Sequence, residues 1–292
     1  MKRIYVLTMI LIFAGEKNVL AHDLGTNNML YNLRASAKLA MKTVKYLCMI
    51  IFTCISLISY ADCEKIIPTL ISKLHHHYFD SGFKFTACKV WPADPTKTII
   101  ALALTKDEDR QAASFDLDVL VVDSRSGEVI ARNLKKDAIT SDAITFQSLV
   151  IDTARYKLNK QSNAFGVRMN YSGSSHVNPL EVQYFNLYHF HHKKLTQTIN
   201  DLLVYHFGGE QDDMGCASQF HEFNSILSLS HSETNHFADI IVTDKRSILM
   251  FKSLKGECVN EVVERPKIKF YLRYDGKGYV IPKIKNRGYY NY

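Results

Sequence analysis

Extended segments separated by turn-favouring residues are the feature that most constrains the fold. The longest run covers residues 149–190, where strand-like segments are interrupted at Ser162-Asn163, Ser172-Gly173 and Asn178-Pro179. Stretches of β-branched and aromatic residues bounded by Gly, Pro, Asn and Ser are typical of strands joined by turns. The pattern predicts a chain dominated by antiparallel hairpins.

Four hairpins are predicted along the chain, each with a polar or glycine-containing turn. The first has its turn at residues 123–127, where Gly127 can adopt a positive φ. The hairpins pair residues 117–122 with 128–132, 182–190 with 195–199, 226–230 with 237–243, and 268–274 with 279–282. Regular hairpins build sandwiches or the blades of propellers. We therefore expect a mainly β fold, either a hairpin-built sandwich or propeller-like sheets, while residues 133–148 have no clear pattern.

One helix is predicted before the first strand, over residues 63–79. Its apolar residues recur at helical spacing and form one face: Ile66, Ile67, Leu70, Ile71 and Leu74. Pro68 lies in the first turn, where a helix tolerates proline.

The N-terminal region has the pattern of a secretory signal peptide at residues 41–61. Lys42 and Lys45 precede an apolar run, and Ser59 and Ala61 are the small residues that signal peptidase requires. Residues 1–40 are then an over-extended start or an extra N-terminal segment. Residues 62–292 are expected to form a single β-rich domain in the periplasm or outside the cell, held to a membrane only if the N-terminus is not cleaved.

Charge gives little support to nucleic-acid binding. The chain has a net charge of +7, but residues 1–61 carry seven of its 36 basic residues and two of its 29 acidic ones. The remainder has a net charge of only +2, and no basic stripe with interleaved aromatic residues is present.

Four of the six cysteines follow the predicted signal peptide: Cys63, Cys88, Cys216 and Cys258. An even number in an exported protein predicts two disulfides. Three pairings are possible, and we favour Cys63–Cys88 with Cys216–Cys258 because each closes a local loop. A zinc site is disfavoured because no CxxC spacing occurs.

Histidines and carboxylates offer alternative sites. His189 and His191 share a face of their predicted strand and could bind a metal with a third ligand from elsewhere. Asp116 and Asp118 also share a face, and we interpret them as the polar side of an edge strand.

Asp152, Arg155 and Arg168 are the polar residues that most deserve a test as a binding patch. With Arg155 and Arg168 on neighbouring strands, the two guanidinium groups could bracket Asp152 in a structural ion pair. The alternative is an exposed surface that binds an anion or a partner.

Three segments, residues 151–156, 164–168 and 174–179, together with residues 88–92 and the Cys216 region, resemble uncharacterised exported proteins of Gram-negative bacteria. The resemblance covers about 63–285. It implies export and disulfide formation, and it implies no activity.

Residues 231–242 are similar to the calcium loop of FG-GAP β-propeller repeats. Glu233, Asn235 and Asp239 occupy ligand positions, but His231 and His236 stand where that loop has an acidic residue and a glycine. Calcium prefers six to eight oxygen ligands. We therefore expect a metal-free turn, with calcium as the lesser alternative.

No GxSxG, phosphate loop or GxGxxG motif is present. We expect a non-enzymatic exported protein without cofactor that binds another protein, of which an immunity protein that neutralises a toxin is one concrete form. The alternatives are a periplasmic metal-dependent hydrolase that uses zinc or calcium, and a membrane-anchored structural protein of the envelope.

Overall fold

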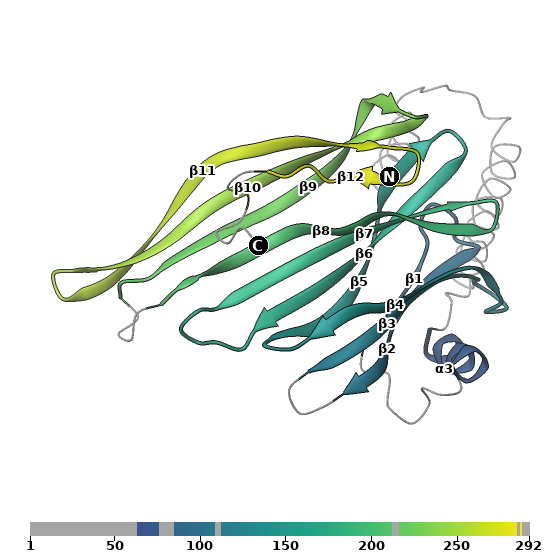
Figure 1. Cartoon of the computed structure of the whole chain (residues 1–292), viewed down its shortest axis with the longest axis horizontal. Coiled ribbons are helices and arrows are strands. Elements are labelled where there is room, and N and C mark those ends of the chain that lie inside the picture. The colour runs from purple at the N-terminus through teal and green to yellow at the C-terminus, as the bar shows by residue number, and fades with distance from the viewer. Residues whose placement is uncertain (1–62, 76–84, 109–111, 212–215, 285–286, 288–292) are drawn as a thin grey trace, which may run out of the picture. The chain divides into compact units, whose positions relative to one another are not determined.

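The computed structural model describes residues 63–75, 85–108, 112–211, 216–284 and 287 (Figure 1). Within these ranges it is mainly β, with one helix and two antiparallel sheets, as the sequence predicts. The predicted signal peptide at 41–61 and the segment 1–40 lie outside the described residues. The described part contains no helix of the length and apolarity that a membrane span requires.

The four-stranded sheet carries the helix on one of its faces (Figure 1). Its strands, in spatial order, are β1 (Phe85–Val90), β2 (Lys97–Glu108), β3 (Ala113–Asp123) and β4 (Val129–Ser141). Leu70 and Ile71 of helix α3 (Cys63–Leu74) pack on Leu102 and Leu120. The opposite face of the same strands packs on the second sheet. Burial on both faces explains the continuous apolar runs at residues 99–104 of β2 and 119–122 of β3.

The eight-stranded sheet is a meander in which each strand pairs with the next strand of the chain. Its members are β5 (Ile144–Asn159), β6 (Ser162–Gly173), β7 (Leu180–His191), β8 (Lys194–Glu210), β9 (Gln219–Thr234), β10 (Phe237–Leu254), β11 (Glu257–Tyr274) and β12 (Tyr279–Val280). Phe165 and Val167 join Val119 in the core between the sheets, and Trp91 packs edge-on against Phe165.

A second core forms within the eight-stranded sheet itself. Tyr156 and Leu158 of β5 share it with Ile240 and Val242 of β10, and β5 contacts β10 although five places separate them in the strand order. Register shifts along the β7–β8 pair interrupt the ladder. Because bulges increase the local twist of a sheet, they allow it to curl onto itself in this way.

The turns explain where the sequence prediction was accurate and where it was not. The predicted hairpin at residues 191–194 turns on His192 and Lys193, which have φ values of 47° and 59°. The β5–β6 turn falls at Lys160-Gln161, two residues before the predicted position. Residues 133–148 lie mostly in β4 and β5, and the long β10–β11 hairpin was not predicted.

Both predicted disulfides are confirmed. Cys63–Cys88 joins the start of α3 to β1, with Cα atoms 6.1 Å apart. Cys216–Cys258 joins the segment before β9 to the start of β11, with Cα atoms 5.5 Å apart. Two disulfides in one chain are typical of proteins from oxidising compartments.

Candidate functional site

A cleft of about 670 Å³ lies between the end of β4 and the face of β6, β7 and β8. Its floor is formed by apolar and aromatic residues from these three neighbouring strands: Met169, Tyr171, Leu180, Val182, Tyr184 and Leu203. Ala138 and Thr140 of β4 line the opposite wall. Pockets of this size with an apolar lining and a few polar groups are typical of binding sites.

Strand register explains why these side chains lie together. Met169 is directly opposite Tyr184, and Tyr171 is directly opposite Val182. Val182 is in turn opposite His206 on β8. Directly opposite residues of an antiparallel pair project from the same face, so the three strands present one continuous surface. The rings of Tyr171 and Tyr184 meet edge-on, with centroids 5.7 Å apart.

Asp201 supplies the carboxylate at one end of the floor. Its φ of 52° is left-handed, a conformation that aspartate tolerates better than most residues. The Asp201 main-chain N–H donates to Oδ1 of Asn186 at 2.7 Å, and Asn200 Nδ2 donates to Oδ2 at 2.9 Å. Oδ1 of Asp201 is buried and accepts no hydrogen bond from the described residues. The carboxylate is therefore held in place but incompletely satisfied.

Arg287 lines another part of the cleft, where its charge is already balanced. Its Nε lies 3.0 Å from Oδ2 of Asp244, which is fully buried, and its Nη2 donates to the Leu203 carbonyl at 2.6 Å. The guanidinium also lies over the rings of Phe223 and Phe270. These contacts give Arg287 a structural role across β8 to β11.

His206 and Tyr171 are two rings of the cleft whose pKa values are shifted, and both are neutral at neutral pH. His206 is buried and stacks on Phe223, and burial lowers its pKa below the ordinary value of 6.5. Burial, followed by the charge of Asp201 and the proximity of Tyr184, raises the pKa of Tyr171 well above its ordinary range. Tyr171 therefore keeps its hydroxyl proton.

The second carboxylate of the cleft, Asp142, lies at the other end of the floor. Ile144, whose N–H donates to Asp142, is opposite Gly173, whereas Asn186, the partner of Asp201, is opposite Val167. Six positions of β6 separate Gly173 from Val167, or about 20 Å of strand. Both carboxylates line the cleft, and different elements of the fold hold them there.

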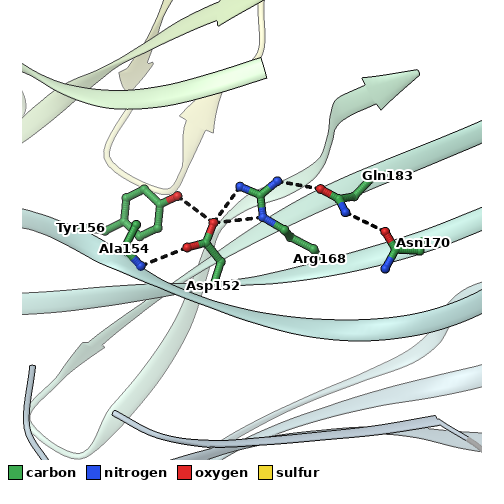
Figure 2. A network of polar contacts seen from close by, with 6 residues as sticks. All are labelled: Asp152, Ala154, Tyr156, Arg168, Asn170 and Gln183. Carbon is green, nitrogen blue, oxygen red and sulfur yellow. Dashed lines mark hydrogen bonds and ion pairs between the residues drawn. The ribbon is translucent and has the colours of Figure 1, made fainter. Parts of the chain in front are cut away.

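Asp152 and Arg168 form the ion pair that the sequence suggested (Figure 2). Arg168 Nη2 lies 2.7 Å from Asp152 Oδ2, to which Tyr156 also donates through its hydroxyl. Arg168 Nη1 donates to Gln183, which donates in turn to Asn170. Burial opposes ionisation of Asp152, but the Ala154 N–H and Arg168 outweigh it and lower the pKa of the carboxyl.

Arg155 takes no part in this network. It lies on β5 with Asp152, and its side chain is exposed. The structure therefore joins Asp152 and Arg168 in a structural ion pair and leaves Arg155 exposed at the surface.

His189 and His191 lie on one face of β7, with parallel rings 5.9 Å apart. Burial and the neighbouring His191 lower the pKa of His189, whose ring also packs edge-on against Phe237. No group of three metal-binding side chains occurs in the part of the chain that the structure describes.

The segment that resembles a calcium loop is a two-residue hairpin turn between β9 and β10. Asn235 and His236 have φ values of 50° and 66°. Asp239 is buried and accepts hydrogen bonds from Ser232 and Thr234 at 2.8 and 2.7 Å. Glu233 is exposed on β9. Asp239 therefore bonds to hydroxyl groups of its own hairpin rather than pointing, together with Glu233 and Asn235, at one metal position.

Asp116 and Asp118 correct the edge-strand interpretation. They lie on β3, which has a neighbour on each side, and both side chains are buried. Asp118 accepts a hydrogen bond from Arg132 Nε at 3.0 Å and lies 2.7 Å from Nε2 of His75 at the end of α3. This cluster joins the helix to the sheet.

The cleft residues were not identified from the sequence. Asp201 falls inside an extended segment, and only its combination with Asn200, which interrupts the apolar pattern of β8, could have indicated an irregular position. Tyr171 and Tyr184 read as ordinary strand residues. Their convergence depends on register between strands.

Comparisons with models of protein families, with curated proteins and with solved structures find no match to this chain. Because a fold alone does not define a function, the geometry of the cleft carries the functional argument.

Proposed function

We propose that this is a non-catalytic protein of an oxidising compartment that binds another protein through the cleft over β6, β7 and β8. The observation that carries the proposal is the cleft itself, with its apolar and tyrosine-rich floor and its incompletely satisfied carboxylate at Asp201. Aromatic side chains in a pocket are the usual anchors of protein interfaces. A protein that neutralises a toxin exported to the same compartment is one form of this function.

The use of the buried charges supports binding over catalysis. Asp118 pairs with Arg132, Asp152 with Arg168, and Asp244 with Arg287. Each of these carboxylates is buried or nearly so, and each pair joins neighbouring elements of the fold. Removing one partner of such a pair would leave an uncompensated buried charge, so these carboxylates are committed to the fold.

A partner-capture experiment with matched variants tests the proposal. The cleft is filled by Leu203→Trp, and Ile226→Asp alters an exposed apolar residue outside the cleft as a control. Wild-type protein and the control are expected to retain the same partner from an extract of the exporting cell. The Leu203→Trp variant is expected to lose it while unfolding at a similar temperature. Equal retention by all three would contradict the cleft as the binding site.

A further inference from the structure

We propose that the cleft accepts a cationic alkyl side chain, a lysine or arginine of the bound protein, with the charged head at Asp201 and the methylene stem over Met169 and Tyr184. This inference rests on the proposed function and specifies its partner chemistry.

The carboxylate of Asp201 has an unmet demand for a donor. Oδ1 is buried without a hydrogen-bond partner among the described residues, although the side chain as a whole is 39% exposed. Lys135 forms an ion pair with Asp201, with Nζ 3.6 Å from Oδ2. However, Lys135 Nζ donates its hydrogen bond to Asn200 Oδ1, at 2.6 Å. Because Oδ1 is buried and the side chain is still 39% exposed, a second cation would reach this carboxylate from its Oδ2 side, where charge-assisted hydrogen bonds are roughly twice as strong as neutral ones.

The floor suits the rest of such a side chain. Met169 and Tyr184 lie directly opposite each other, and Leu203 is opposite Tyr184 on the next strand. Lysine and arginine bury their methylene stems along apolar surface while the head remains polar. Tyr171 and Tyr184 add aromatic rings, whose faces attract a cation. An apolar floor that ends at a carboxylate selects for both parts of the side chain.

The opposite reading, an anionic ligand, has weaker support. Arg287 already pairs with Asp244, and His206 is buried beside Phe223 with its pKa lowered by that burial. An anion would therefore find no unbalanced cation on the floor among the described residues. Glu264 is exposed on β11 outside the cleft, which makes it a charge control for Asp201.

The test is a titration of the folded protein, labelled with ¹³C at its methionine methyl groups, with small probes of equal length. Met169 reports on the floor, and Met169→Leu assigns its resonance. Hexylammonium, hexanoate and 1-hexanol carry the same chain with a positive, a negative and no charge. We expect hexylammonium to bind about tenfold more tightly than hexanoate, a difference of about 1.4 kcal/mol. Asp201→Asn should reduce its affinity to that of 1-hexanol, and Glu264→Gln, outside the cleft, should leave it unchanged.

Three results would overturn the inference. Equal binding of the three probes would show an apolar cleft without charge selection, and preference for hexanoate would show an anion site. Either result leaves the cleft available as a protein-binding site, so the proposed function would survive. If no probe shifted the Met169 methyl resonance, the cleft would not bind an alkyl side chain. The capture experiment with Leu203→Trp would then test the proposed function separately.

Discussion

The main-chain N–H of Asp201 donates a hydrogen bond to the side-chain Oδ1 of Asn186, 15 residues earlier on the neighbouring strand. Asn186 is buried, and its Nδ2 lies 3.7 Å from the sulfur of Met169 on the cleft floor. One amide thus fixes the irregular backbone at Asp201 and contacts the surface beside it. Asn186 is a positioning residue for the acidic end of the cleft.

Replacing Asn186 by alanine is expected to lower both stability and binding. The partly buried N–H of Asp201 would lose its acceptor, which costs about 1 kcal/mol. Asn224, which is exposed on β9, provides the control through Asn224→Ala, with little change expected. Chemical denaturation measures the stability, and the hexylammonium titration measures the binding. If Asn186→Ala bound hexylammonium as tightly as wild type, the hydrogen bond from Asp201 to Asn186 would not position the carboxylate.

Asp118→Ala should destabilise the packing of the helix on the four-stranded sheet. The change leaves Arg132 and His75 without the buried carboxylate between them. Breaking a buried pair by removing one partner costs about 3 kcal/mol or more. Asp142→Ala removes an exposed carboxylate as the control, and denaturant unfolding compares the two. Similar midpoints for both variants would contradict the structural role of Asp118.

Arg168 and Arg155 should differ sharply when each is replaced by methionine. Arg168 bonds to Asp152 and Gln183 and lies over the ring of Phe185, whereas Arg155 is exposed. We expect Arg168→Met to cost about 2 kcal/mol, the range for hydrogen bonds to charged groups. Arg155→Met should stay within about 0.5 kcal/mol of wild type. Equal losses would contradict a structural role for the Arg168 network that Arg155 does not share (Figure 2).

The stability of the protein should fall in mildly acidic solution, and His206 should contribute. Burial lowers its pKa in the folded state below the unfolded value of 6.5. The contribution is thus complete above pH 6.5 and is lost as the pH falls through the lower folded pKa. His206→Phe should flatten the pH profile of unfolding there, while exposed His231→Gln should not. His189 and His221, shifted in the same direction, should retain part of the slope.

Each disulfide should stabilise the fold through the loop that it closes. Cys63–Cys88 spans 25 residues and Cys216–Cys258 spans 42. Loops of these lengths correspond to about 3.5 and 4 kcal/mol in the chain-entropy model. Paired replacement by serine, followed by denaturation without reductant, measures both values. Loss of either pair without effect on the midpoint would show that the bond does not form in solution.

Much of the fold could be predicted because its information is local. Gly127 marks the β3–β4 turn, Asn235 and His236 form a tight turn where the sequence places one, and the helical spacing of Leu70 and Ile71 marks the face of α3 that is buried. The β10–β11 hairpin was missed because Lys255-Gly256 joins a mostly half-buried distal half of β10 to a mostly exposed distal half of β11, and neither has a clear alternation of buried and exposed residues.

The cleft could not be predicted because it depends on non-local geometry. Tyr171, Tyr184 and His206 meet only through the register of three strands, and Asp201 becomes a distinct site only through its bond to Asn186. Asp118 was misjudged for the same reason. Whether a strand lies at the edge or the centre of a sheet is decided by pairing, and pairing leaves little trace in a single strand.

Site-specific photo-cross-linking tests the central claim, that the cleft contacts the partner, most directly. A photoreactive phenylalanine is introduced at Thr140, which is exposed on the cleft wall, or at Lys157, which is exposed on β5 outside the cleft. Irradiation in the intact cell is followed by measurement of cross-linked mass. We predict one discrete adduct from position 140, abolished by Leu203→Trp, and none from position 157. No adduct at position 140, or the same adduct at both positions, would contradict the account.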